Sequence, residues 1–180
     1  MDKVAVLLAE GFETIEALTV VDVLRRAGVG VTLVSTMDSR KVLSGQQILV
    51  HADLHFNDVD FSEYSWLVIP GGFPAVKRLS EDVRVLDLVK DFASHKHLAA
   101  ICAGPGVLNE LSLLNNINFV SYPDSVSGSA ANNRLDDNVY FEKNILSAKS
   151  MAHALEFSLY LLERVSDLQT VERVKNSLCL

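Results

Sequence analysis

The chain has 180 residues, 49% hydrophobic and 22% charged, which predicts one compact domain over residues 1–180 with a substantial core. The formal net charge of -7, without any block of basic residues, argues against a nucleic-acid partner and against an anionic membrane surface. The N-terminal apolar run is too short for a signal peptide or a membrane span, and two cysteines make no disulfide framework. We therefore expect a cytoplasmic protein with free thiols.

Buried strands and amphipathic helices alternate in the first half of the chain. Lys3–Ala9 is a continuous apolar run, typical of a strand covered on both faces. Thr14–Ala27 has apolar residues at helical spacing, with Thr14 as the expected N-cap and Gly28 as the left-handed stop. Further strands are expected at Val31–Thr36, Gln47–His51 and Ser65–Pro70, followed by a helix that Ser80 caps and that ends near Ser94.

The second half continues this alternation and adds an antiparallel hairpin. We expect a strand at His97–Cys102, a helix at Gly104–Leu114, a strand at Asn118–Tyr122 and a long loop at Gly128–Asn138. A hairpin is expected at Val139–Ala148, with its turn at Glu142–Asn144. Two helices follow at Met151–Arg164 and Asp167–Lys175, and Ser166 and Gln169 are spaced as a capping box of the second. The order predicts a three-layer α/β/α sandwich with a flavodoxin-like, mostly parallel sheet. Ligands of such sheets bind beyond the carboxyl ends of the strands.

Cys102 stands where a predicted strand gives way to the sequence Ala-Gly-Pro-Gly. A nucleophile in a strained strand-to-helix turn needs small neighbours, which Ala100, Ala103 and Gly104 provide. Amides at the start of the helix near Gly104 would stabilise a thiolate. The alternative is a small buried filler, because free cysteine is often buried. The second cysteine, Cys179, is interpreted as an incidental thiol.

Two other segments end at the same predicted edge of the sheet. Gly71 and Gly72 follow a strand and are either an oxyanion-binding turn or an ordinary tight turn. Glu13 and Glu16 begin the first helix, where solvated carboxylates are common. Packing of Glu16 beside Cys102 would instead allow the two groups to titrate as a coupled pair.

The histidines do not form a metal motif. His51 and His55 are four residues apart but lie at a strand end and a loop, and no glutamate completes a zinc motif. His95 and His97 straddle a helix-to-strand junction. His153, near the expected pocket, is either a proton carrier or a capping residue. From the histidine spacing we expect no metal site. No glycine-rich phosphate loop follows the first strand, so we also expect no nucleotide cofactor.

The segments LAEGFETIEALTVVDVLRRAG, LVIPGG and AAICAGPGVL resemble, in this order and spacing, the ThiJ/PfpI family, also called the Parkinsonism-associated deglycase superfamily, and in particular its small homodimeric branch. The resemblance implies a class I glutamine amidotransferase-like fold, no cofactor, and a homodimer formed through the first helix. It implies that Cys102 is a reactive, oxidisable nucleophile and that Glu16 is hydrogen-bonded to it. By the same resemblance the amides of Gly72 and Ala103 form an oxyanion pocket, and Arg26 matches a family arginine.

The chain departs from the family pattern at several positions. Ala103 replaces the histidine of protease-type relatives, so a Cys-His protease is not expected. Tyr122 stands before Pro123 where deglycase relatives often have histidine, and Ser150, Met151 and Ala152 replace Gly-Pro-Gly. Gly45 matches a family arginine at the dimer-facing rim, which predicts weaker binding of anionic substrates.

Three functions follow as hypotheses. The first is a cofactor-independent enzyme of glyoxalase or deglycase type, in which Cys102 adds to a reactive aldehyde such as methylglyoxal or to its adducts. The second is an oxidative-stress sensor or redox-regulated chaperone that uses oxidisable Cys102. The third is a binding module without catalytic activity. The convergence of three motifs on the carboxyl edge of the predicted sheet argues against it. The extra apolar residues of the first helix, Ile15, Val20, Val23 and Leu24, also suggest that a second copy covers this helix.

Overall fold

A seven-stranded sheet forms the centre of the computed structural model, which describes residues 2–180. Its strands are β1 (Lys3–Leu8), β2 (Gly30–Ser35), β5 (Leu54–His55), β6 (Trp66–Ile69), β7 (His97–Ile101), β8 (Val139–Glu142) and β9 (Ile145–Ala148). Their order is β5-β2-β1-β6-β7-β9-β8, and every pairing is parallel except that of β8 with β9. The predicted mostly parallel α/β sandwich is confirmed.

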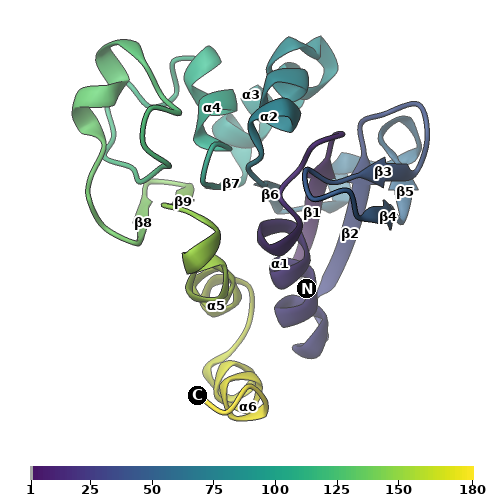
Figure 1. The fold of residues 1–180 in the computed structure, drawn as a ribbon. Helices are drawn as coiled ribbons and strands as arrows, with labels where there is room; N and C mark the ends of the chain where they lie inside the picture. Colours follow the sequence, from purple (N-terminus) through teal and green to yellow (C-terminus); the bar gives the residue numbers. More distant parts are fainter. Residues whose placement is uncertain (1) are drawn as a thin grey trace.

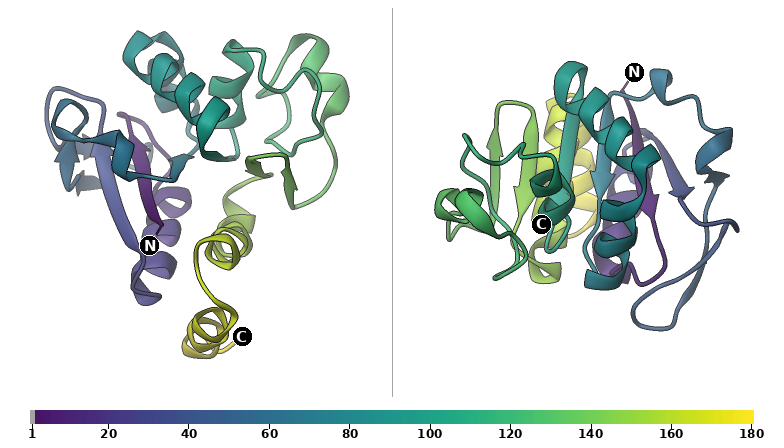
Figure 2. Two further views of the ribbon diagram at one scale, coloured as in Figure 1. Left: turned by 180° about the vertical axis from the view of Figure 1, so that it is seen from behind. Right: turned by 90° about the horizontal axis from the view of Figure 1, so that it is seen from above.

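Helices cover both faces of this sheet (Figures 1 and 2). One face carries α1 (Thr14–Arg26), α5 (Ala154–Val165) and α6 (Leu168–Ser177), and the other carries α2 (Phe73–Glu81), α3 (Val83–His95) and α4 (Pro105–Glu110). Short 3-10 turns lie at Phe56–Asp58, Phe61–Glu63, Gly128–Asn133 and Met151–His153. No helix within residues 2–180 combines the length and the apolar character needed to cross a bilayer.

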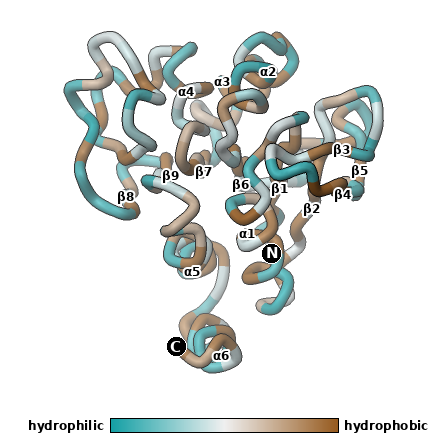
Figure 3. The backbone as a smooth tube through the Cα atoms, in the orientation of Figure 1, coloured by the Kyte–Doolittle hydropathy of each residue, from teal (hydrophilic) through white to brown (hydrophobic). Residues whose placement is uncertain are grey.

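The central strands are apolar because both of their faces are covered. Figure 3 shows this as a hydrophobic centre surrounded by hydrophilic loops. Leu7, Leu67, Ile69 and Leu98 are completely buried, and each such side chain contributes about 1.5–3 kcal/mol by leaving water. The burial of β1, β6 and β7 fixes the register of the three strands whose carboxyl ends carry the candidate site.

The predicted strand Gln47–His51 does not join the main sheet. Its last part is β4 (Leu49–His51), which pairs antiparallel with β3 (Lys41–Leu43) in a separate two-stranded sheet. Leu49 is 60% exposed, so this hairpin lies on the surface instead of forming a βα unit. The apolar residues of this segment suggested a strand of the central sheet, but such a strand must be covered on both faces, and this one is not.

Helix starts differ from the predictions where a carboxylate is available nearby. The predicted helix after Ser80 is two helices, with Ser80 inside α2 and Asp82 as the N-cap of α3. Glu13, and not Thr14, caps α1 through a bond from the Glu16 amide. Asp167 caps α6, so the box with Ser166 is wrong. An ionised oxygen accepts from helical amides more strongly than a hydroxyl, which explains these choices.

The segment after Cys102 is less regular than expected. The helix predicted to reach Leu114 ends at Glu110. The segment Asn118–Tyr122 is not a strand, since its only ladder contact within residues 2–180 is an isolated bridge from Phe119. The position beside β7 is taken by β9. The β8–β9 hairpin has the predicted turn, with Lys143 in the left-handed region at φ 56°.

Candidate active site

Three loops meet at the carboxyl edge of adjacent strands. Strand β6 lies between β1 and β7, so the loop that starts α1, the pair Gly71–Gly72 and the turn at Cys102 are neighbours in space. The Glu13 amide donates to Gly71 O at 3.1 Å and links the first two loops directly. This edge is where open parallel sheets bind ligands.

Cys102 occupies a strained turn. Its φ is 62°, a left-handed value that costs a non-glycine residue about 1–3 kcal/mol and persists only when its surroundings enforce it. Here the Cys102 amide donates to Ala148 O at 2.9 Å, and Cys102 O accepts from the Tyr122 amide at 2.8 Å. A Cβ on Gly104 would lie 2.3 Å from Ile69 O, so the turn requires glycine at that position. These contacts hold the thiol at the edge of the sheet.

Glu16 is a fully buried carboxyl group beside this thiol. Its side chain has no exposed surface, and its Oε2 accepts from the Gly71 amide at 2.7 Å. Its Oε1 has no hydrogen-bond partner of good geometry within residues 2–180. Burial raises the pKa of Glu16 to about 7, although interactions with the Cys102 thiol and the amides of Gly71 and Met151 oppose the increase. A carboxyl group with this pKa can exchange a proton near neutral pH.

The thiolate stabilisation expected from backbone amides at Cys102 is outweighed by burial and by Glu16. Burial and then the negative charge of Glu16 raise the pKa of the thiol to about 12, and the Ala103 amide opposes this only in part. Helix α4 begins at Pro105, which has no N–H to offer. With Glu16 ionised, Cys102 is therefore a thiol at neutral pH. The thiol and the carboxyl group must be treated as a pair that shares a proton.

The three backbone amides assigned to an oxyanion pocket do not have equal roles. The Gly71 amide is already bonded to Glu16, so it is not available to a developing oxyanion. The amides of Gly72 and Ala103 have no carbonyl acceptor within residues 2–180. Gly72 has φ 92°, and a Cβ there would lie 2.2 Å from Gly11 O, so the close approach of these two loops depends on glycine.

Three other predicted residues lie around this pair. Tyr122 is 43% exposed, and its ring packs edge to face against Phe73, with centroids 6.0 Å apart. Glu13 is the N-cap of α1, and its carboxylate accepts from the Glu16 amide. His153 follows β9, and its Nδ1 lies 3.2 Å from Ser150 Oγ. His153 is the N-cap residue of α5, but its side chain makes no capping hydrogen bond.

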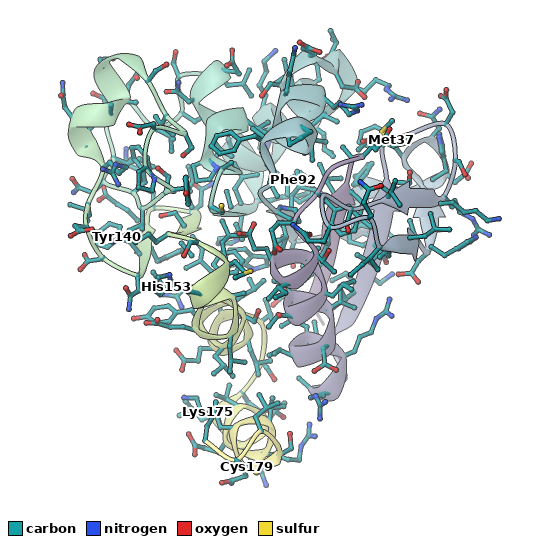
Figure 4. The ribbon with its side chains drawn as sticks, in the orientation of Figure 1. Met37, Phe92, Tyr140, His153, Lys175 and Cys179 are labelled. Atoms are coloured by element: carbon teal, nitrogen blue, oxygen red, sulfur yellow. The ribbon has the colours of Figure 1, made fainter. Side chains whose placement is uncertain are left out.

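Arg26 is not part of the site. It lies in the last turn of α1, at the opposite end from Glu16, where its Nε donates to Asp22 at 2.8 Å. Cys179 is also remote, at the exposed C-terminal end (Figure 4). Two surface hollows, of about 470 and 430 Å³, lie between the ends of α1, α5 and α6 and between α2 and α4, and neither is lined by Cys102 or Glu16.

Several contacts of the site are not among the predicted residues. Ser125 Oγ donates to Cys102 O at 3.4 Å, and the Met151 amide interacts with the Glu16 carboxyl group. Gln46 accepts two hydrogen bonds from Thr14 at the start of α1. No local pattern points to Ser125 or Gln46, because each reaches the site from a loop distant in the sequence, whereas Met151 lies in the segment that replaces Gly-Pro-Gly. Phe73 could have been noticed as an aromatic residue directly after Gly71–Gly72.

Known proteins share this fold. The model of the DJ-1/PfpI family matches residues 2–164. Protein dj-1beta of Drosophila melanogaster is 30% identical over 96% of this chain and 94% of its own length, and Deglycase TK1284 of Thermococcus kodakarensis is 31% identical over 82% and 89%. The chain spans only 37% of Protein DJ-1 homolog B of Arabidopsis thaliana, with 26% identity. The structure of oxidised Toxoplasma gondii DJ-1 superposes with a TM-score of 0.91 at 30% identity, over 99% of this chain and 98% of that one.

Proposed function

Because the chain belongs to the DJ-1/PfpI family, we propose that it is a cytoplasmic, cysteine-dependent enzyme that converts reactive aldehydes or their adducts, with methylglyoxal to lactate as the test reaction. The observation that carries the proposal is the pairing of buried Glu16 with Cys102 in its left-handed turn. The relative named a deglycase supports the same class of chemistry. The reaction needs no cofactor.

The pKa values of the pair suggest how the nucleophile forms. Glu16, with its pKa of about 7, is ionised in a large fraction of molecules at neutral pH and can accept the Cys102 proton as the sulfur bonds to the aldehyde carbon. The developing oxyanion would accept hydrogen bonds from the amides of Gly72 and Ala103. General-base removal of the proton makes a free thiolate unnecessary before substrate arrives.

The remaining steps are internal to the substrate. Glu16 would first pass the Cys102 proton to the oxyanion, which becomes a hydroxyl group. The regenerated carboxylate would then take the proton from the former aldehyde carbon and return it to the neighbouring carbonyl carbon, while the hydroxyl proton moves to the oxygen of that carbon. The first carbon is thereby oxidised to a thioester on Cys102 while the second is reduced to a carbinol. Water then breaks the thioester bond, which releases lactate and restores the thiol. Two electrons move between adjacent carbons of the substrate, so no external oxidant or reductant is required.

The charges around the sulfur favour an uncharged substrate. The ionisable groups that shift the pKa of Cys102 are Glu16 and Glu13, and both are acidic. Arg26 is paired with Asp22 at the far end of α1, and Gly45 carries no side chain. A neutral aldehyde therefore fits this site better than a carboxylate-bearing one.

The function is tested by incubating purified protein with methylglyoxal and measuring lactate. We expect turnover that falls at least about 100-fold in Cys102→Ala, because the covalent intermediate cannot form. Cys179→Ser is the matched control and should retain wild-type turnover, since this thiol is exposed and remote.

Lactate formation equal in the wild type and Cys102→Ala would overturn the proposal. The sensor alternative has a different readout, namely oxygen added to Cys102 at near-stoichiometric peroxide, followed by intact mass spectrometry. A protein that makes no lactate but oxidises at Cys102 well before Cys179 would favour sensing.

We also propose that the protein is a homodimer, using the start of α1 and the β3–β4 hairpin. The apolar residues Val20, Val23 and Leu24 do not support this, because they are buried within one chain, where α1 packs against α5. What supports it are Ile15 and Ile48, each 48% exposed, and Leu49, 60% exposed. Exposed apolar residues on adjoining elements are typical of interfaces.

Light scattering should give twice the 19.8 kDa of one chain at micromolar concentration. Leu49→Glu should shift the mass towards one chain by placing a charge at the interface, with an unchanged circular dichroism spectrum. Leu168→Glu changes an even more exposed leucine, 79% exposed and on α6, and should leave the mass unchanged. A wild-type mass of 19.8 kDa would contradict the dimer.

A further inference from the structure

Gln46 holds the helix that carries Glu16. Its Oε1 accepts from the Thr14 amide at 3.2 Å and from Thr14 Oγ1 at 2.8 Å. Thr14 is the first residue of α1, where backbone amides have no partner within the helix. Thr14 is only 9% exposed, so the exposed side chain of Gln46 supplies an acceptor to two donors that have little contact with water.

The loop that carries Gln46 is itself anchored on both sides. The Gly45 amide donates to Phe12 O at 2.9 Å, and the Gly11 amide donates to Leu43 O at 2.8 Å. Within the loop, Ser44 O accepts from the Gln47 amide at 3.1 Å. The surface hairpin is therefore tied to the loop before α1 by its backbone, and to α1 itself by one side chain. Gln46 makes this second connection.

The connection ends near the reacting groups. Glu16 lies in the first turn of α1, which Gln46 holds at Thr14 and the Glu13 carboxylate holds at the Glu16 amide, 2.8 Å away. At its other end the Glu16 side chain is bonded to the Gly71 amide at 2.7 Å. A shift of the first turn would move the carboxyl group relative to Cys102, and catalytic groups tolerate displacements of only about 0.5 Å.

We propose that Gln46 is a positioning residue for the Cys102–Glu16 pair, and that its hydrogen bonds to Thr14 fix the first turn of α1 and thereby the separation of the Glu16 carboxyl group from the Cys102 sulfur. This inference rests on the pair described in the proposed function and extends it to a residue of the surface hairpin. It concerns the reactivity of the thiol and is testable without an aldehyde substrate.

The test measures the alkylation rate of Cys102 by iodoacetamide against pH in a Cys179→Ser background. Gln46→Leu removes the oxygen that accepts from Thr14. The titratable groups that influence the pKa of Glu16 are Cys102 and Glu13. An opened turn admits water to Glu16, so we expect the lower midpoint of the profile to move down by about half a pH unit or more. Methylglyoxal turnover should fall about tenfold in kcat with little change in KM.

Three further variants make the result specific. Gln46→Glu keeps the acceptor and should restore kcat to within about threefold of wild type, while its charge moves the midpoint up instead of down. Thr14→Val loses only the hydroxyl donor and should give a smaller downward shift that does not add to that of Gln46→Leu. Gln47→Asn, beside Gln46 but without a side-chain bond to α1, should match wild type.

The proposal is overturned if Gln46→Leu has the pH profile of Gln47→Asn, even when its thermal stability is lower. If Gln46→Leu does not fold, an unshifted profile in Thr14→Val overturns the proposal and a downward shift supports it. Absence of lactate formation in every variant, together with the predicted shift in alkylation, would sink the proposed enzymatic function and leave the positioning role standing.

Discussion

Replacing Glu16 with glutamine should raise the free energy of unfolding by about 3 kcal/mol above pH 7 and leave it nearly unchanged below pH 4.5. The reason is that burial raises the pKa of Glu16 in the folded protein to about 7, from 4.5 in the unfolded chain. Below pH 4.5 the carboxyl group is protonated in both states. As the pH rises to 7, the unfolded chain releases this proton more readily, so the wild type loses stability that Glu16→Gln retains.

Urea denaturation between pH 4.5 and 8.5 measures this difference. Glu172→Gln removes an exposed carboxylate of α6 and controls for the change in net charge. A stability difference between wild type and Glu16→Gln that stays constant across this range would contradict the buried, proton-exchanging carboxyl group. The same variant should lower the pKa of the Cys102 thiol, because the charge of Glu16 is one of the causes that raise it.

Gly72→Ala should destabilise the fold by at least about 3 kcal/mol. The added Cβ would lie 2.2 Å from Gly11 O, at a residue whose φ of 92° already disfavours any side chain. Relief requires the loop of Gly11 to Glu13 to move away, and this loop positions the start of α1. We therefore expect lost stability and lost turnover together.

Gly28→Ala is the matched control for Gly72→Ala. Its φ of 79° is also left-handed, but nothing lies within 4 Å of the added Cβ. The free energy of unfolding should fall by only about 1 kcal/mol, which is the cost of placing a side chain in the left-handed conformation. Urea denaturation of both variants separates the two effects, and equal losses would show that the approach of Gly11 O is not what requires glycine at position 72.

The residues of the candidate site differ in how far local sequence predicts them. Cys102 stands out because a strand, a cysteine and a run of small residues follow each other directly, and the structure places it in a left-handed turn. Glu13 and Glu16 are ordinary helix-start carboxylates in sequence, and only the adjacency of β1, β6 and β7 makes one of them the neighbour of Cys102. Arg26 shares the helix of Glu16 but is separated from the site by the length of α1.

The amino-acid sequence by itself determined the alternation of strands and helices, the mostly parallel sheet, the left-handed stop at Gly28 and the β8–β9 hairpin, because hydrophobic period and turn residues act over a few neighbours. Tertiary structure alone decided that the Gly71 amide binds Glu16, that α5 covers the extra apolar stripe of α1, and that Gln46 reaches Thr14. Tertiary structure also raises the pKa of Cys102. A thiol pKa depends on burial and on charges brought close by folding, and at this site both act against the local tendency of the turn.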